Sequence, residues 1–172
     1  SCVLLNIGGT YDFRHCTIAN YYNYDIRQSS ALVINNYYLL YDDDGVFVDT
    51  IARDLDKAYF GNCIVYGNAD EEKFFSKTPR ADFSYEFENC LLKTTSIGNG
   101  SYSNCIKNQD PLFSDYYLND YTLDTLLSPA VNAGSMEIVN NSVLNIAYDL
   151  LGNSRTADEA PDLGAYELDE SR

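Results

Sequence analysis

The sequence has no Trp and a single His, and it is poor in cations. Only 11 Lys and Arg residues stand against 26 Asp and Glu residues, which gives a formal net charge of -15. Nucleic-acid binding needs clustered Lys and Arg to neutralise phosphates, so this balance argues against it, and we expect no nucleic-acid partner. It also argues against binding to an anionic membrane surface. We expect no cofactor, although the acidity permits Ca²⁺.

Long apolar runs are missing as well. No stretch approaches the roughly 18 apolar residues of a membrane-spanning helix, so we expect no span in this segment. No signal peptide is visible, and the chain begins at Ser1, without Met, inside a copy of a repeated motif. We therefore expect a piece of a longer protein whose targeting signals and anchor lie elsewhere.

What the sequence does contain is a recurring phrase of a small polar residue, a Cys and then apolar residues. Five cysteines share this frame, namely Cys2, Cys16, Cys63, Cys90 and Cys105, and Ala31 takes the Cys position in a sixth copy. A unit that recurs along a chain predicts short stacked strands, in which each copy contacts mainly its neighbours.

The cysteines are odd in number, so they cannot all pair within the chain, and their spacing matches no zinc pattern. A free Cys in a core behaves as a small hydrophobe. We therefore predict a structural ladder of buried thiols, with a disulfide or a metal site as the alternatives.

Strand alternation predicts which way the side chains point. If each Cys points inward, the residue two positions later does too, and this residue is apolar in every copy except that of Lys107. The positions between them are mostly apolar as well, which is typical of parallel sheets covered on both faces. We favour the inward cysteine, and the opposite register stays open.

The pattern changes at Asp110, after which no segment repeats another. Repeat proteins need an atypical terminal unit to cover the apolar end of the stack. We therefore divide the domain into repeated strands over residues 1–109 and a capping segment over residues 110–172. Within this segment Arg155 lies between Asp149 and Asp162, and we assign these three a structural role because a buried Arg needs a carboxylate partner.

Six motifs occur in a set order from residue 62 onward, namely NCIVYGN, DPLF, YTL, SPAVNAG, DLLGNSR and PDLGAYE. In this order they resemble the C-terminal region of secreted bacterial proteins of the choice-of-anchor Q type, which belong to the pectin-lyase-like proteins. The resemblance is close over residues 60–167 and covers residues 1–60 only through the repeat.

The resemblance implies an all-β fold, a right-handed single-stranded parallel β-helix, and export to a bacterial cell surface. One departure concerns length, since a turn around three faces needs roughly 18 residues or more. The spacings of 14 residues from Cys2 to Cys16 and 15 from Cys90 to Cys105 are shorter. Either these turns are compact or some copies lie on different faces.

Catalytic residues cannot be assigned, and whether the chain is an enzyme stays open. β-helix polysaccharide lyases pair a charge-neutralising group with a base. Lys93, Lys107 and Arg14 make an unconvincing set, and His15, the only His, takes the same place as Asn62 in the repeat. For metal binding we select Asp42 and Asp44 in an acidic turn, which lacks the spaced EF-hand pattern.

Tyrosines gather at the turns and can stack on sugar rings, because Tyr has an apolar face and a polar edge. The candidates for carbohydrate contact are Tyr21, Tyr22, Tyr24, Tyr37 and Tyr38. We therefore expect a monomeric surface segment that contacts polysaccharide without catalysis. The alternatives are a fragment of a lyase or glycosidase with its site on missing N-terminal strands, and a structural scaffold.

Overall fold

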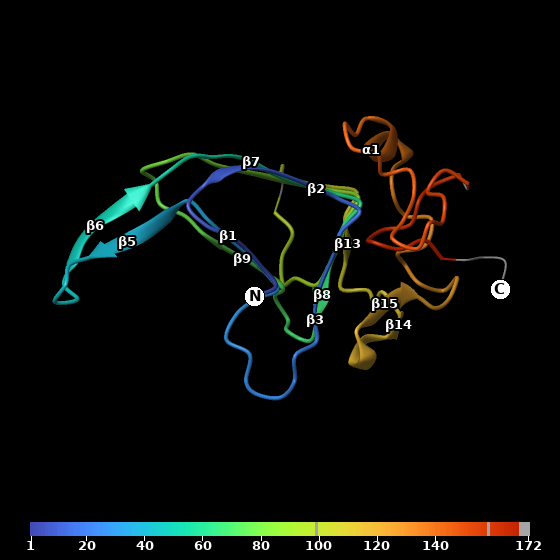
Figure 1. Cartoon of the computed structure of the whole chain (residues 1–172), viewed down its shortest axis with the longest axis horizontal. Coiled ribbons are helices and arrows are strands. Elements are labelled where there is room, and N and C mark those ends of the chain that lie inside the picture. Colours follow the sequence, from blue (N-terminus) through green and yellow to red (C-terminus); the bar gives the residue numbers. More distant parts are fainter. Residues whose placement is uncertain (99, 158, 169–172) are drawn as a thin grey trace.

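The computed structural model describes residues 1–98, 100–157 and 159–168 and consists mainly of short strands (Figure 1). Three sheets are parallel. The first contains β1 (Val3–Leu5), β4 (Leu32–Asn35) and β9 (Lys73–Ser76). The second contains β2 (Gly9–Arg14), β7 (Leu55–Gly61), β10 (Phe83–Glu88) and β12 (Tyr102–Ser103). The third contains β3 (Thr17–Asn20), β8 (Ile64–Gly67), β11 (Leu91–Leu92) and β13 (Ile106–Lys107).

Two antiparallel pairs complete the strands. One joins β5 (Tyr37–Tyr41) to β6 (Phe47–Ala52), and the other joins β14 (Phe113–Asp115) to β15 (Asp120–Leu123). The described helices are short, the 3₁₀ turn η1 (Tyr116–Leu118) and α1 (Met136–Asn140). In the described part of the chain, no helix is both long and apolar enough to cross a membrane.

The predicted fold class, one right-handed solenoid, is wrong. The described residues form several small sheets, parallel and antiparallel, and none of these is closed or coiled. Two local causes separate them. Corner residues with positive φ interrupt the strands between the second and third sheets, and residues 37–52 fold back on themselves as an antiparallel hairpin.

The corners explain the polar residue that precedes most of the cysteines. His15, Asn62, Asn89 and Asn104 have φ of 50°, 53°, 49° and 51°, in the left-handed region. Few residues other than Gly adopt this region, and Asn and His are enriched among those that do. The polar residue is therefore selected by backbone geometry where the chain turns from the second sheet into the third.

The cysteine copies fall into two groups. The strands that follow Cys16, Cys63, Cys90 and Cys105 are parallel neighbours in the third sheet. Cys2 lies elsewhere, because β1 pairs with β4 and the Cys2 amide donates to the carbonyl of Ala31 at 2.8 Å. The 14 residues from Cys2 to Cys16 therefore lead from one sheet to another. This spacing is short because the two copies lie on different faces.

The predicted inward register is confirmed in the third sheet. Cys63 and Val65 belong to the core enclosed by the three parallel sheets. The residue between them, Ile64, belongs to a second core on the outer face of the sheet, together with Phe113 and Leu163. Both faces are covered, which is why these strands are apolar throughout.

A column of aromatic rings crosses the second sheet. The distances between ring centroids are 5.0 Å from Phe13 to Phe60, 4.6 Å from Phe60 to Phe87 and 5.3 Å from Phe87 to Tyr102. The ring planes are nearly parallel, so the rings are stacked face to face. Parallel pairing in register places each ring over the next. The sequence signal for this column is an aromatic residue three positions before each of four cysteines.

The segment after residue 110 lies beside the third sheet rather than over the end of the stack (Figure 1). The amide of Gly164 donates to the carbonyl of Asn62 at 2.8 Å, and that of Ala165 donates to Oγ1 of Thr17 at 3.0 Å. The described part of this segment therefore covers the outer face of β8 and β11, where Ile64 and Leu91 pack with Phe113 and Leu163.

Candidate functional site

A hollow of about 290 Å³ lies where the loop after β3 meets η1 and β15. Six tyrosines line it, three from each side of the contact, together with three asparagines and one alanine. The tyrosines are Tyr21, Tyr22, Tyr24, Tyr116, Tyr117 and Tyr121. We call this feature the tyrosine hollow.

The rings at the base of the tyrosine hollow hold one another in place. Tyr21 stacks on Tyr116 with 4.3 Å between ring centroids and 20° between ring planes, and it lies 6.4 Å from the ring of Tyr121. Tyr116 in turn lies 4.4 Å from the ring of Tyr117. Tyr21 therefore joins the loop to the C-terminal segment and forms a preformed aromatic floor.

The rings at the rim are available to a ligand. Tyr22 is 50% exposed, Tyr24 is 89% exposed and Tyr117 is 72% exposed. Tyr22 and Tyr24 lie 5.8 Å apart with tilted rings. The arrangement is three exposed aromatic rings beside a stacked floor, which suits a flat ligand with apolar faces and a polar perimeter.

A buried ion pair fixes the loop that carries Tyr21, Tyr22 and Tyr24. Arg27 donates to the carbonyl of Asn20 at 2.5 Å and pairs with Glu72, whose side chain is fully buried. Glu72 also accepts hydrogen bonds from the amides of Ala31 and Ala69 at 3.0 Å.

Gly67 permits this close packing. A Cβ atom at position 67 would overlap the carbonyl of Asn20 and a carboxylate oxygen of Glu72. The position of the loop therefore depends on the absence of a side chain at residue 67.

Asp110 is a charged group that acts on Tyr21 in the floor of the tyrosine hollow. Burial, followed by the charge of Asp110, raises the pKa of Tyr21, and the same two causes in the same order raise the pKa of Tyr66. No Lys or Arg is among the described residues that line the tyrosine hollow.

The structure separates the predicted carbohydrate-contact residues into two groups. Tyr21, Tyr22 and Tyr24 meet in the tyrosine hollow, whereas Tyr37 and Tyr38 lie on β5 of the projecting hairpin (Figure 1). Sequence reasoning missed the other half of the hollow, Tyr116, Tyr117 and Tyr121. The sequence indicates these three only as a second cluster of tyrosines. Because they follow the change of pattern at Asp110, we predicted a capping role for the segment that contains them.

The acidic turn at the tip of the hairpin has a structural explanation. Oδ1 of Asp42 accepts hydrogen bonds from the amides of Asp44 at 3.1 Å and Val46 at 2.8 Å. Across the described ranges, no group of three or more His, Cys, Asp or Glu side chains gathers as metal ligands. Calcium binding at Asp42 and Asp44 stays a prediction.

Four of the five predicted ladder cysteines lie in file. The amide of Cys16 contacts Sγ of Cys63 at 3.5 Å, and that of Cys63 contacts Sγ of Cys90 at 3.4 Å. All five thiols are free. Cys105 continues the file, while Cys2 is exposed and its Sγ contacts the carbonyl of Ala19.

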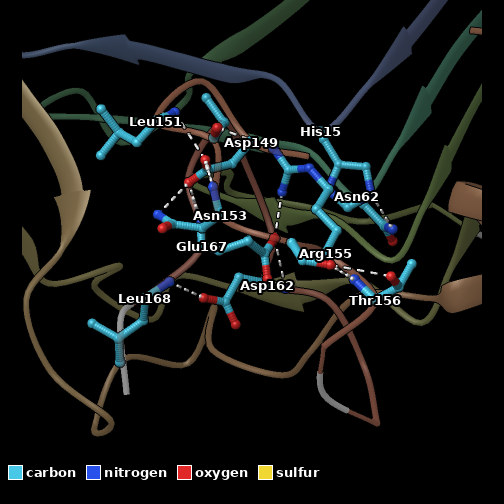
Figure 2. Close-up of polar contacts among 12 residues, drawn as sticks. His15, Asn62, Asp149, Leu151, Asn153, Arg155, Thr156, Asp162, Glu167 and Leu168 are labelled. Atoms are coloured by element: carbon cyan, nitrogen blue, oxygen red, sulfur yellow. Dashed lines mark hydrogen bonds and ion pairs between the residues drawn. The ribbon is translucent and has the colours of Figure 1, made fainter. Parts of the chain in front are cut away.

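Arg155 has the carboxylate partner that was expected, but the partner is Glu167 (Figure 2). The guanidinium also donates to the carbonyl of Ala165 at 3.0 Å. Burial raises the pKa of Glu167 to about 7, against the opposing effects of the amide of Asp162 and of Arg155.

The two predicted carboxylates organise the chain around this pair. Asp149 accepts from the amides of Asn153 and Glu167 at 2.7 and 2.9 Å, and Asp162 accepts from the amide of Leu168 at 2.7 Å. Although burial opposes it, the hydrogen bonds from Glu167 and Asn153 hold the pKa of Asp149 below its usual value. These contacts support a structural role.

The cations weighed for catalysis are dispersed. Arg14 pairs with Asp12 at 2.9 Å, Nζ of Lys93 lies 5.6 Å from the ring centroid of Tyr66, and Lys107 donates to a backbone carbonyl.

His15 is buried beside Asn62, whose amide lies 2.9 Å from Nε2. Because Nδ2 of Asn62 is a donor, Nε2 accepts, and the neutral ring carries its proton on Nδ1. Burial lowers the pKa of His15 to about 3, and the charge of Arg155 acts in the same direction. A ring that stays neutral and buried is unsuited to act as a base on an external ligand.

Comparison with known proteins found no matching family profile, no matching curated protein and no matching solved structure. The geometry of the tyrosine hollow is therefore the basis for a functional proposal.

Proposed function

We propose that this segment binds polysaccharide through the tyrosine hollow and takes no part in catalysis. The observation that carries the proposal is the convergence of six tyrosines, from two segments about a hundred residues apart, on one preformed depression. Aromatic faces bind the C–H faces of sugar rings, and Tyr hydroxyls and Asn amides bind sugar hydroxyls. The resemblance of the six C-terminal motifs to secreted bacterial proteins supports a place at the bacterial cell surface.

The floor and the rim have different parts in this proposal. Tyr21 and Tyr116 are stacked before any ligand arrives, so their ordering costs nothing on binding. Tyr22 and Tyr117 are exposed and supply the contact surface. The side-chain amides of Asn23 and Asn119 line the same depression and can hydrogen-bond to hydroxyls.

A glycan array followed by calorimetric titration with the best-bound glycan tests the proposal. Tyr22→Ala and Tyr117→Ala should each weaken binding about tenfold, because each removes one stacking face. Tyr41→Ala is the matched control, since Tyr41 is 51% exposed but lies on the hairpin. Circular dichroism establishes that all three variants are folded.

Unchanged affinity in both hollow variants contradicts the proposal. A loss confined to Tyr41→Ala would move the site to the hairpin and contradict it as well. Failure of the wild-type protein to bind any glycan of the array would overturn it.

A further inference from the structure

We infer that the tyrosine hollow selects uncharged glycans and discriminates against chains that contain uronates. This inference rests on the proposed function and specifies its ligand class. A sugar carboxylate bound in a protein needs a cation or several N–H donors to replace its hydration. The described residues that line the hollow are Tyr, Asn and Ala, so the Asn amides offer neutral N–H donors to hydroxyls and carboxylates alike, and no cation is present to favour a carboxylate.

The nearest Arg on the same loop cannot fill this role. Arg27 is paired with Glu72 at 2.5 Å and donates to the carbonyl of Asn20, and its side chain is only 12% exposed. Turning the guanidinium toward a ligand would leave the fully buried carboxylate of Glu72 without its cation, which is costly. Arg27 therefore positions the loop and does not neutralise an anion.

Asp110 adds a repulsive element. After burial, its charge is the next cause that raises the pKa of Tyr21, in the floor of the hollow, and of Tyr66, in the core against which Tyr21 packs. The chain as a whole carries a formal net charge of -15. A uronate would approach the charge of Asp110 with no Lys or Arg among the described lining residues to pair with it, whereas a neutral sugar would keep its ring stacking and its hydroxyl hydrogen bonds.

Matched pairs of polymers test this inference, each pair consisting of an acidic glycan and the same glycan with its carboxylates reduced to alcohols. Polygalacturonate and its carboxyl-reduced galactan form one such pair. At low salt the reduced member should bind at least about fivefold more tightly, from the Coulomb energy of one unscreened like-charge contact. The difference should shrink as salt is added, because salt screens exposed charges.

Asp110→Asn separates charge from shape. Oδ1 of Asp110 accepts from the amide of Leu112 at 2.9 Å, and the Asn side chain keeps that acceptor. The variant should bind the acidic member about threefold more tightly than the wild type and the neutral member equally. Asp44→Asn, the same charge change at the hairpin tip, should alter neither affinity.

Tighter binding of the acidic members, or equal binding of both members at low salt, overturns the inference and leaves the proposed function standing. Binding to neither member of any pair overturns the proposed function and the inference with it.

Discussion

The second parallel sheet and the β5–β6 hairpin are both rich in aromatic and aliphatic residues, but their side chains end in opposite environments. Phe60 and Phe87 are fully buried, whereas Phe47 is 52% exposed and Tyr41 is 51% exposed. In the sheet, parallel neighbours repeat the same position, so each ring stacks on the next. The hairpin is a two-stranded antiparallel sheet, and no third strand among the described residues pairs with it. The number of apolar residues therefore does not decide which side chains are buried here. Burial follows where neighbouring strands carry an apolar residue at the same paired position.

The largest expected effect tests this contrast with one substitution type at two places. Phe87→Ala should lower the free energy of unfolding by about 3–5 kcal/mol, because it empties a fully buried site within the ring column. Phe47→Ala on the hairpin should lower it by about 1 kcal/mol or less. Urea unfolding measures both, and equal losses would contradict the contrast.

A second comparison sets a buried ion pair against an exposed one. Arg27→Ala leaves Glu72 buried without its cation and should cost about 3 kcal/mol. Lys57→Ala breaks the pair between Lys57 and Glu86, whose side chains are 51% and 43% exposed, and should cost less than about 1 kcal/mol. Thermal and urea unfolding of the two variants measure the difference. Similar losses of stability in the two variants would contradict this prediction, because they would show that the carboxylate of Glu72 is solvated.

The third effect concerns pH and the single His. The pKa of His15 is about 3 in the folded protein against an unperturbed value of 6.5, so below pH 6.5 the unfolded chain binds a proton that the folded chain excludes. Stability from this group is therefore present above pH 6.5 and is lost as the pH falls toward 3.

His15→Asn tests this linkage, since Asn occupies the same left-handed corner in three other copies. Between pH 7 and pH 5 the wild type should lose about 2 kcal/mol more stability than the variant. Urea unfolding at the two pH values measures this. Glu167 and the other acids titrate in both proteins and cancel, so parallel curves would contradict a neutral, buried His15.

The smallest effect concerns the hairpin tip. Asp42→Ala removes the side-chain acceptor for the amides of Asp44 and Val46, so hydrogen exchange of these two amides should quicken. Global stability should change by less than about 0.5 kcal/mol, because the turn is exposed. The amides of Phe60 and Phe87 serve as the internal reference, because their hydrogen exchange should be slower and should not change with the substitution. A loss of global stability on this substitution would contradict the prediction, because it would show that the hairpin unfolds together with the core.

The sequence allowed the parallel pairing and the inward register of the third sheet to be predicted, since both follow from alternation around Cys63 and Cys90. It misassigned Cys2, because the same phrase begins strands in two different sheets. The single solenoid was wrong because a repeat specifies which strands pair and does not specify whether the resulting sheets join.

The candidate site was half predicted. The cluster of Tyr21, Tyr22 and Tyr24 was visible, but its partners lie about a hundred residues later and are brought in by burial of Phe113 and Leu123 against the third sheet. The partner of Arg155 was missed for a similar reason, since Glu167 reaches it only after the bends at residues 163–165. Contacts between distant segments are set by packing, which local patterns do not encode.

The bare backbone at Gly67 has a practical consequence for engineering the loop that packs on it. Tyr22, Asn23 and Tyr24 can be varied to test the proposed binding, whereas even one added methyl group at position 67 would overlap the carbonyl of Asn20 at the start of the loop. A library built on this scaffold should vary the loop and keep that glycine constant.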